Sequence, residues 1–151
     1  MYILIVEDDH SQAELIEEAL KQEADLNSSS YKIRRLSTES QFRDHFEDIA
    51  ERKPDVIVMD VMLRWTDPAP NAKAPPDDIL KEGCYRAGVR NARLLAQNES
   101  TKRIPVILYT MLEKIDLGDT SELPGLTYLP KDSELAPLVQ AVRAATSKNI
   151  P

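Results

Sequence analysis

Six polar side chains of types that bind cations or phosphoryl groups follow short apolar runs: Glu7, Asp8, Asp9, Asp60, Thr110 and Lys131. Carboxylates can bind a cation, a hydroxyl can donate a hydrogen bond, and an ammonium group can balance negative charge. These groups can act together only if the runs are neighbouring strands, because the carboxyl ends of parallel strands meet at one edge of a sheet.

Clustered carboxylates repel one another, and burying them without a partner is costly. A hard divalent cation resolves this conflict, because Mg²⁺ prefers oxygen ligands and commonly combines one or two carboxylates with water and phosphate oxygens. A neighbouring carboxylate, here Asp60, can then attack phosphorus and form an aspartyl phosphate. Lys131 and the metal would offset charge on the transferring phosphoryl group, and Thr110 could donate to one of its oxygens. We therefore expect Mg²⁺ as the cofactor.

Each of these residues has an ordinary explanation when considered alone. An acid at a strand end is more often a turn former or a helix cap. Lys131 alone would be a solvated surface lysine, and Thr110 alone would suit any strand. The prediction rests on the whole set, because its members occupy strand ends in the order that one fold requires.

The runs that precede these residues are short and continuous: Ile3–Val6, Val56–Met59, Val106–Tyr109 and, more weakly, Leu126–Leu129. Runs of this length are typical of strands buried on both faces of a parallel sheet. The segment Tyr31–Leu36 alternates instead, which indicates a strand nearer the sheet edge.

Amphipathic patterns of helical period separate the strands: Ser11–Ala24, Gln41–Arg52, Val89–Asn98 and Ser133–Thr146. Ser133 can cap the last helix, and Pro137 falls near its first turn, where a missing N–H costs little. Gly118 and Pro124 interrupt the segment Leu112–Gly125, which predicts only a short or irregular helix. The alternation predicts an α/β fold, a doubly wound five-stranded parallel sheet with helices on both faces.

The bulk composition excludes several classes of protein. A length of 151 residues favours one domain, residues 1–151, and a net charge of −7 argues against direct binding of nucleic acid. The single cysteine, Cys84, allows no internal disulfide and fits a reducing compartment. No stretch approaches the roughly 18 apolar residues that span a bilayer, and the first apolar run is too short for a signal peptide. We expect a cytoplasmic protein without membrane contact.

Four segments carry specific motifs: Ile3–Asp9 (ILIVEDD), Pro54–Asp60 (PDVIVMD), Pro105–Thr110 (PVILYT) and Tyr128–Lys131 (YLPK). Together they resemble the receiver domain of two-component response regulators, over nearly the whole chain except Arg64–Ala87. The resemblance implies the flavodoxin-like strand order 2-1-3-4-5 and a phosphoprotein switch in phosphorelay signal transduction. A sensor histidine kinase or histidine phosphotransfer protein would donate the phosphoryl group, and an unknown output protein would respond.

The resemblance also implies roles for individual residues. Asp60 matches the phosphoacceptor. Glu7 and Asp8, rather than the Asp8-Asp9 doublet, match the acidic pair that binds the metal, with Asp8 in direct contact and Glu7 acting mainly through water. Met62, two residues beyond the phosphoacceptor, would supply a backbone carbonyl to the metal.

Three further residues match the machinery that answers phosphorylation. Thr110 matches the switch hydroxyl and Lys131 the phosphate-binding lysine. Tyr128 matches an aromatic switch whose ring turns inward when the hydroxyl is drawn to the phosphoryl group. Equally, Tyr128 could be a half-exposed aromatic of an ordinary strand.

The region after Asp60 departs from the family pattern. Relatives usually have a glycine soon after the phosphoacceptor, at a helix entry, and the best candidate here is Gly88. Residues 64–87 thus resemble an insertion, which is either a tolerated surface loop or a lid or partner-docking element. Arg64 replaces the usual proline, and Trp65 either contacts a partner or packs the loop down.

Other departures concern assembly and output. Asp132 stands where many relatives have proline, as in some receiver subfamilies. The weak helix in 112–125 puts the usual dimer mode in question, so a homodimer is only one of the expected assemblies. The chain ends at Pro151 without an effector domain. We expect a stand-alone regulator or part of a longer one.

Two other functions fit parts of the sequence. A phosphorylation-independent interaction module of the same fold would use the inserted loop instead of the acidic pocket. An aspartyl-phosphate phosphatase would need a second aspartate where this chain has Met62, and a P-loop enzyme would need a glycine-rich Lys-Ser/Thr motif. We therefore predict a switch rather than a turnover enzyme.

Overall fold

The computed structural model describes residues 1–27, 29–123, 125–132 and 134–147. At its centre lies a five-stranded sheet in the order β2-β1-β3-β4-β5, and every neighbouring pair is parallel. The strands are β1 (Tyr2–Val6), β2 (Lys32–Leu36), β3 (Val56–Met59), β4 (Val106–Thr110) and β5 (Leu126–Pro130). Both the α/β class and the 2-1-3-4-5 order predicted from the sequence are confirmed.

The burial of each strand follows its sequence pattern. Every residue of the central strands β3 and β4 is buried, as continuous apolar runs indicate. Strand β2 lies at one edge and exposes part of its alternating sequence to solvent. The prediction that this segment lies nearer the sheet edge is therefore confirmed.

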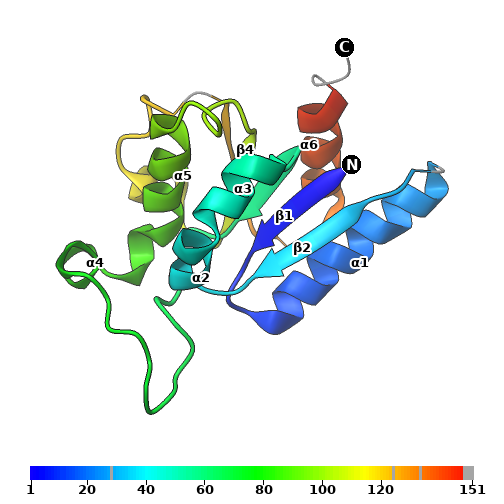
Figure 1. Cartoon of the computed structure of the whole chain (residues 1–151). Helices are drawn as coiled ribbons and strands as arrows, with labels where there is room; N and C mark the ends of the chain where they lie inside the picture. Colours follow the sequence, from blue (N-terminus) through cyan, green and yellow to red (C-terminus); the bar gives the residue numbers. More distant parts are fainter. Residues whose placement is uncertain (28, 124, 133, 148–151) are drawn as a thin grey trace.

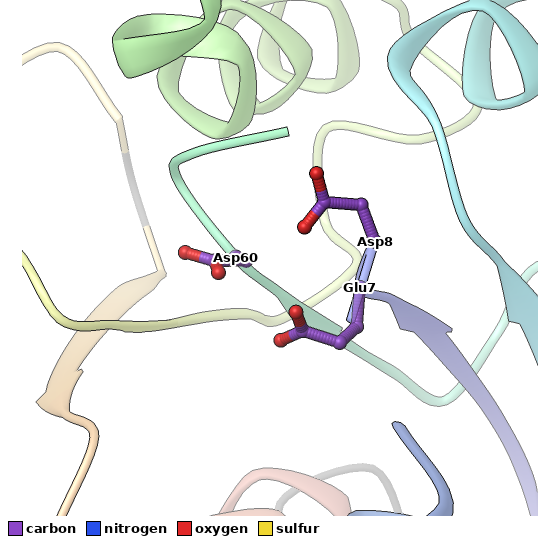
Figure 2. A group of neighbouring side chains, drawn as sticks. All are labelled: Glu7, Asp8 and Asp60. Carbon is purple, nitrogen blue, oxygen red and sulfur yellow. The ribbon is translucent and has the colours of Figure 1, made fainter. Parts of the chain in front are cut away.

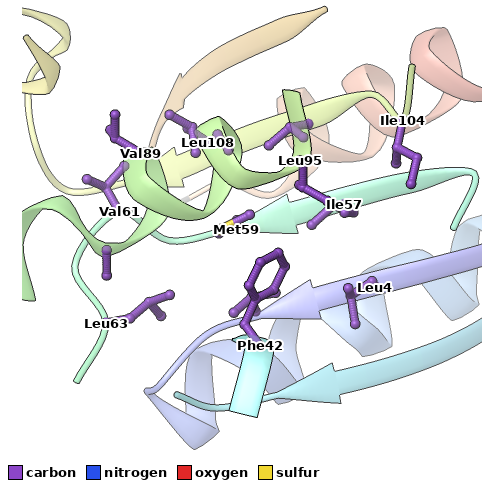
Figure 3. Packing of buried hydrophobic residues seen from close by; sticks show 14 of the residues in the cluster. Leu4, Phe42, Ile57, Met59, Val61, Leu63, Val89, Leu95, Ile104 and Leu108 are labelled. Atoms are coloured by element: carbon purple, nitrogen blue, oxygen red, sulfur yellow. The ribbon is translucent and has the colours of Figure 1, made fainter. Parts of the chain in front are cut away.

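Helices cover both faces of the sheet (Figure 1). Helices α1 (His10–Leu26) and α6 (Ala136–Ser147) pack on the face that Ile3 and Ile5 of β1 present. Helices α2 (Glu39–Asp44), α3 (Phe46–Arg52) and α5 (Ala87–Gln97) pack on the face of Leu4 and Val6. Figure 3 shows this second core, in which Phe42 lies near the sheet and Leu95 over β3. Successive residues of a strand thus fill two separate cores.

One predicted helix is divided in the structure, and the short helical segments after residue 76, described below, were not predicted. The predicted single helix Gln41–Arg52 is two helices, α2 and α3, which meet at His45 with φ −100° and ψ 10°. The His45 ring and its backbone N–H both contact the Gln41 carbonyl, at 2.8 Å and 3.0 Å, and this arrangement accompanies the break.

Near the C-terminus, the structure agrees with the sequence where it describes the chain. Pro137 is the second residue of α6, within the first turn as predicted. Ser133, the predicted cap of that helix, lies outside the described residues. The weak segment after β4 holds a short 3₁₀ turn, η2 (Lys114–Leu117), as its interrupted pattern predicts.

The connection from β3 to α5 is long and extends away from the sheet, as Figure 1 shows. Residues 64–76, all of which the structure describes, contain no helix or strand, and α4 (Asp77–Glu82) and the 3₁₀ turn η1 (Cys84–Arg86) follow. The start of this connection is attached to α2, because Glu39 N–H donates to the Arg64 carbonyl at 3.0 Å and Ser40 N–H to the Trp65 carbonyl at 2.9 Å. That this region is an insertion stays a prediction.

The Trp65 side chain packs the connection down. Its Nε1–H donates to the Lys73 carbonyl at 2.8 Å, and the cationic groups of Arg43 and Lys73 each lie 5.7 Å from its ring centroid. Lys73 also pairs with Asp44 at 2.7 Å. Of the two interpretations of Trp65, the structure favours the packing role.

A buried ion pair joins the helices beneath this connection. Arg90 of α5 donates to both carboxylate oxygens of Glu39 of α2, at 2.9 Å and 2.7 Å, and their side chains are 8% and 0% exposed. Burial alone would lower the pKa of Arg90, but the carboxylates of Glu39 and Glu82 raise it overall. Arg90 therefore keeps its positive charge, and its two hydrogen bonds to Glu39 fix α2 against α5. No helix in the described ranges is long and apolar enough to cross a bilayer.

Candidate functional site

Three carboxylates meet at the carboxyl edge of the sheet. Glu7 and Asp8 directly follow β1, and Asp60 directly follows β3 (Figure 2). The parallel register sets this arrangement, because Val6 pairs with Met59 and the Asp60 N–H donates to the Val6 carbonyl at 2.9 Å. One oxygen from each carboxylate lies within 4.8 Å of the other two. An all-oxygen set of this size fits a hard divalent cation.

The Lys131 side chain enters the cluster from the loop after β5. Its Nζ lies 2.7 Å from Glu7 Oε2 and 2.6 Å from Asp60 Oδ2, and its side chain is 8% exposed. The backbone of Lys131 is held by its N–H, which donates to the Thr110 carbonyl at 2.7 Å at the end of β4. Side chains that follow β1, β3 and β5 thus meet here, and the end of β4 holds the backbone of Lys131.

Burial and neighbouring charges both act on the pKa values of Glu7 and Lys131, and some of these effects oppose one another. Burial raises the pKa of Glu7, and Asp60 raises it further, while Lys131 opposes both effects. Burial alone would lower the pKa of Lys131, but the Asp60 and Glu7 carboxylates raise it overall. Lys131 therefore carries a firmly held positive charge, and Glu7 is costly to ionise.

Asp8 has a partner that the sequence analysis missed. Its Oδ2 accepts from the Arg64 backbone N–H at 3.0 Å and from Arg64 Nε at 3.3 Å. The guanidinium also donates through Nη2 to the Asp8 backbone carbonyl at 3.3 Å. The sequence shows a basic residue, Arg64, in the loop after Asp60. No sequence pattern pairs it with Asp8, which lies 56 positions earlier.

Asp9 lies outside the cluster. Its carboxylate caps α1 by accepting from the Gln12 N–H at 3.0 Å, and its own N–H donates to Glu7 Oε1 at 3.1 Å. The structure thus brings Glu7 and Asp8 to Asp60, and it uses Asp9 to begin the helix. The individual roles in metal binding stay predictions.

Thr110 and Tyr128 are connected through one residue, Leu112. The Thr110 hydroxyl oxygen accepts from the Leu112 N–H at 3.3 Å, and the Tyr128 hydroxyl donates to the Leu112 carbonyl at 2.9 Å. Thr110 is fully buried, and the ring of Tyr128 is half-buried against the core. Both side chains named as switch elements therefore hold the same turn after β4.

Met62 and Gly88 lie beside the turn that follows Asp60. The Met62 N–H donates to Asp60 Oδ1 at 3.2 Å, which orients that carboxylate. Gly88 N–H donates to the Val61 carbonyl at 3.0 Å, and a Cβ at Gly88 would lie 2.3 Å from the Asp60 carbonyl oxygen. Only glycine allows α5 to start this close to the loop after Asp60, so the position of Gly88 in the chain has a steric reason.

A cavity of about 720 Å³ opens beside the cluster. Its lining includes Glu7, Asp8 and, on the side of the long connection, Arg64 and Asp67. Asp60 and Lys131 do not line this cavity, so it opens onto the Glu7 and Asp8 side of the cluster. Glu7 and Asp60 are 4% and 5% exposed, whereas the Asp8 side chain is 23% exposed. Asp8 is thus the carboxylate of the cluster that solvent reaches most easily.

Comparison with known proteins gives one result for the sequence and another for the structure. No protein-family model and no curated protein matches this sequence. Solved structures match it over nearly the full length of both chains. A sensor protein from Polaromonas sp. JS666 has a TM-score of 0.69 at 20% identity and covers 97% of this chain and 96% of its own.

Two further solved structures are similar to this chain. The signal receiver domain of a signal transduction histidine kinase from Syntrophus aciditrophicus has a TM-score of 0.67 at 23% identity, with 98% and 91% of the two chains covered. The Mn²⁺-bound form of the response regulator Rcp1 has a TM-score of 0.61 at 23% identity, with 99% and 96% covered. This chain has the receiver-domain fold.

In this receiver fold, the acidic cluster lies where ligands bind in doubly wound sheets, outside the carboxyl ends of the strands. The strand order places β1 beside β3, so Glu7, Asp8 and Asp60 come from adjacent strands. Lys131 reaches them from the loop after β5. The arrangement combines a group of carboxylates suited to a cation with a positive charge in contact with two of them.

Proposed function

We propose that this chain is a response-regulator receiver domain that accepts a phosphoryl group on Asp60 in a Mg²⁺-dependent reaction. A sensor histidine kinase or a histidine phosphotransfer protein is the donor. The phosphorylated form changes which proteins the domain binds, so the domain is a switch and not a turnover enzyme. We place this phosphoprotein in the cytoplasm, because its single cysteine, Cys84, fits a reducing compartment.

The observation that carries this proposal is the position of Lys131 between two buried carboxylates. Its Nζ contacts Glu7 Oε2 at 2.7 Å and Asp60 Oδ2 at 2.6 Å. Glu7 and Asp60 share this one lysine, and a third carboxylate, Asp8, lies beside them with Arg64 as its partner, so three carboxylates face two cationic side chains. The surplus of negative charge is a cost to the fold, and a bound cation would relieve it.

Glu7, Asp8 and Asp60 would hold the metal, together with the Met62 backbone carbonyl. The donor set fits Mg²⁺, because all the side-chain ligands are carboxylates and Asp8 is open to solvent on one side. When bound, the metal supplies electrostatic stabilisation of the phosphoryl oxygens.

In the transfer step, a carboxylate oxygen of Asp60 attacks the phosphorus atom of a phosphohistidine. The new P–O bond forms as the P–N bond breaks, and the imidazole nitrogen keeps the bonding electron pair. Lys131 offsets the negative charge that the phosphoryl group brings to Asp60. The Met62 N–H on Asp60 Oδ1 helps to hold the attacking carboxylate in place.

The response to phosphorylation runs through Thr110. In our proposal, its hydroxyl turns to a phosphoryl oxygen, and the Leu112 N–H loses its present acceptor. The turn after β4 then shifts, and with it the Tyr128 hydroxyl that holds the Leu112 carbonyl. The surface near β4 and β5 would report the state of Asp60 to an output protein.

Phosphorylation by a small-molecule donor tests the proposal. Purified protein is incubated with acetyl phosphate and Mg²⁺, and its intact mass is measured. We expect a gain of one phosphoryl group that EDTA prevents. Unchanged mass with this donor and with a set of histidine kinases would contradict the proposal. It would favour the alternative, a phosphorylation-independent interaction module that uses residues 64–87.

A further inference from the structure

We propose that Arg64 is a positioning residue that competes with the cation for Asp8 and so couples cation binding to the connection after β3. The inference rests on the proposed function, because it assigns a regulator to the same acidic cluster.

The contact between the two residues is extensive. Arg64 uses its backbone N–H and its Nε on one carboxylate oxygen of Asp8, and its Nη2 on the backbone carbonyl of the same residue. Asp8 is also the most exposed of the three clustered carboxylates, with 23% of its side chain open to solvent. Arg64 therefore holds the carboxylate that an arriving cation reaches first.

Charge repulsion makes this contact and a bound cation unfavourable together. A divalent ion at the carboxylates would lie near the guanidinium, and two cations would share Asp8. The Arg64 side chain can move away from Asp8, because it is 45% exposed and Asp67 Oδ1 lies 3.9 Å from its Nη1. Cation binding is thus expected to loosen the guanidinium from Asp8.

The backbone of Arg64 connects this event to the rest of the connection. Its carbonyl accepts from the Glu39 N–H at the start of α2, and the next carbonyl, of Trp65, accepts from Ser40. The Trp65 ring is in contact with the cationic groups of Arg43 and Lys73. A shift of Arg64 would therefore change the surroundings of Trp65, which is the only tryptophan in the chain.

The test measures cation affinity and not activity. Wild type, Arg64→Gln and Arg64→Lys are titrated with Mg²⁺, with calorimetry for affinity and Trp65 emission for the connection. Arg52→Gln is the matched control, because Arg52 pairs with Asp48 on the exposed side of α3 and its removal changes the net charge equally.

We expect Arg64→Gln to bind Mg²⁺ about threefold to tenfold more tightly than wild type at low salt, with a smaller gain at high salt. Arg64→Lys and Arg52→Gln should remain close to wild type. Trp65 emission should change with Mg²⁺ in wild type and much less in Arg64→Gln.

Two results would overturn the inference. If wild type binds Mg²⁺ and Arg64→Gln binds it equally or more weakly, Arg64 does not compete with the cation. The proposed function would be unaffected by that result. Absence of Mg²⁺ binding in every variant would remove the proposed function as well. Calorimetry of the wild type separates these two failures.

Discussion

Lys131 lies between Glu7 and Asp60 with its ammonium group in contact with both carboxylates, at 2.7 Å and 2.6 Å. All three side chains are at least nine-tenths buried. One positive charge therefore serves two negative ones in a place that water barely reaches. This relationship is costly to the fold, and our proposal gives it a role in phosphoryl transfer.

Removing the lysine should destabilise the metal-free protein. Lys131→Met leaves Glu7 and Asp60 without their cation, and we expect a loss of about 3 kcal/mol in EDTA by urea unfolding. Saturating Mg²⁺ should restore part of this loss. Lys21→Met, which removes an exposed lysine paired with Glu17, should change stability by less than about 0.5 kcal/mol. Equal losses in the two variants would contradict the account.

Glu7 should make stability depend on pH and on Mg²⁺. Its pKa is raised in the folded state above the ordinary value of 4.5, so the folded state binds the proton more tightly than the unfolded state. Stability is therefore lost as pH rises from about 4.5 through the folded-state pKa. The cost is absent below 4.5 and is complete only once the pH has passed the folded-state pKa.

The Glu7→Gln variant tests this dependence. In EDTA at neutral pH, we expect the variant to unfold at a higher urea concentration than wild type, and the two midpoints to converge as pH falls below 4.5. Excess Mg²⁺ should reverse the order, because the ionised carboxylate then has a cation. A difference that is independent of both pH and Mg²⁺ would be evidence against this role.

The substitution Gly88→Ala is informative through the sign of the stability change alone. In an ordinary helix position, Gly→Ala stabilises by about 1 kcal/mol. Here the added Cβ would lie 2.3 Å from the Asp60 carbonyl oxygen and 2.7 Å from Val61 Cα. We expect Gly88→Ala to destabilise by about 1–3 kcal/mol and to slow phosphorylation of Asp60. A stabilised variant in thermal unfolding would refute the close contact.

The Glu39–Arg90 pair should behave as a buried ion pair. Arg90→Met removes the bidentate partner of the fully buried Glu39 carboxylate and leaves it only Arg43, at 3.2 Å, so we expect a loss of about 3 kcal/mol by urea unfolding. Adding Glu39→Met should recover much of that loss, because the poorly compensated buried charge is then gone. A double variant as unstable as the sum of both single variants would show that the charges are independent.

Much of the site could be predicted because it depends on strand ends. The continuous runs before Glu7, Asp60 and Thr110 fix which residues follow buried parallel strands, and that edge is where they must meet. The choice of Asp8 over Asp9 came from the family pattern, and the structure adds the reason that Asp9 caps α1.

What could not be predicted depends on pairings between distant segments. Arg64 and Asp8 are 56 residues apart, and Glu39 and Arg90 are 51 apart, so neither pair leaves a local pattern. In the sequence, Glu39 and Arg90 resemble ordinary solvated charges. The break at His45 also escaped prediction, because the apolar spacing of Gln41–Arg52 suits one continuous helix as well as two.

Phosphorylation at a defined carboxylate tests the central claim most directly. Wild type, Asp60→Asn and Asp9→Asn are treated with acetyl phosphate and Mg²⁺, and peptides are mapped by mass spectrometry. Asparagine caps helices as well as aspartate does, so Asp9→Asn is a matched control that keeps the start of α1. We expect one phosphoryl group on Asp60 in wild type and Asp9→Asn, and none in Asp60→Asn. Modification of Asp60→Asn at the wild-type rate would contradict the account.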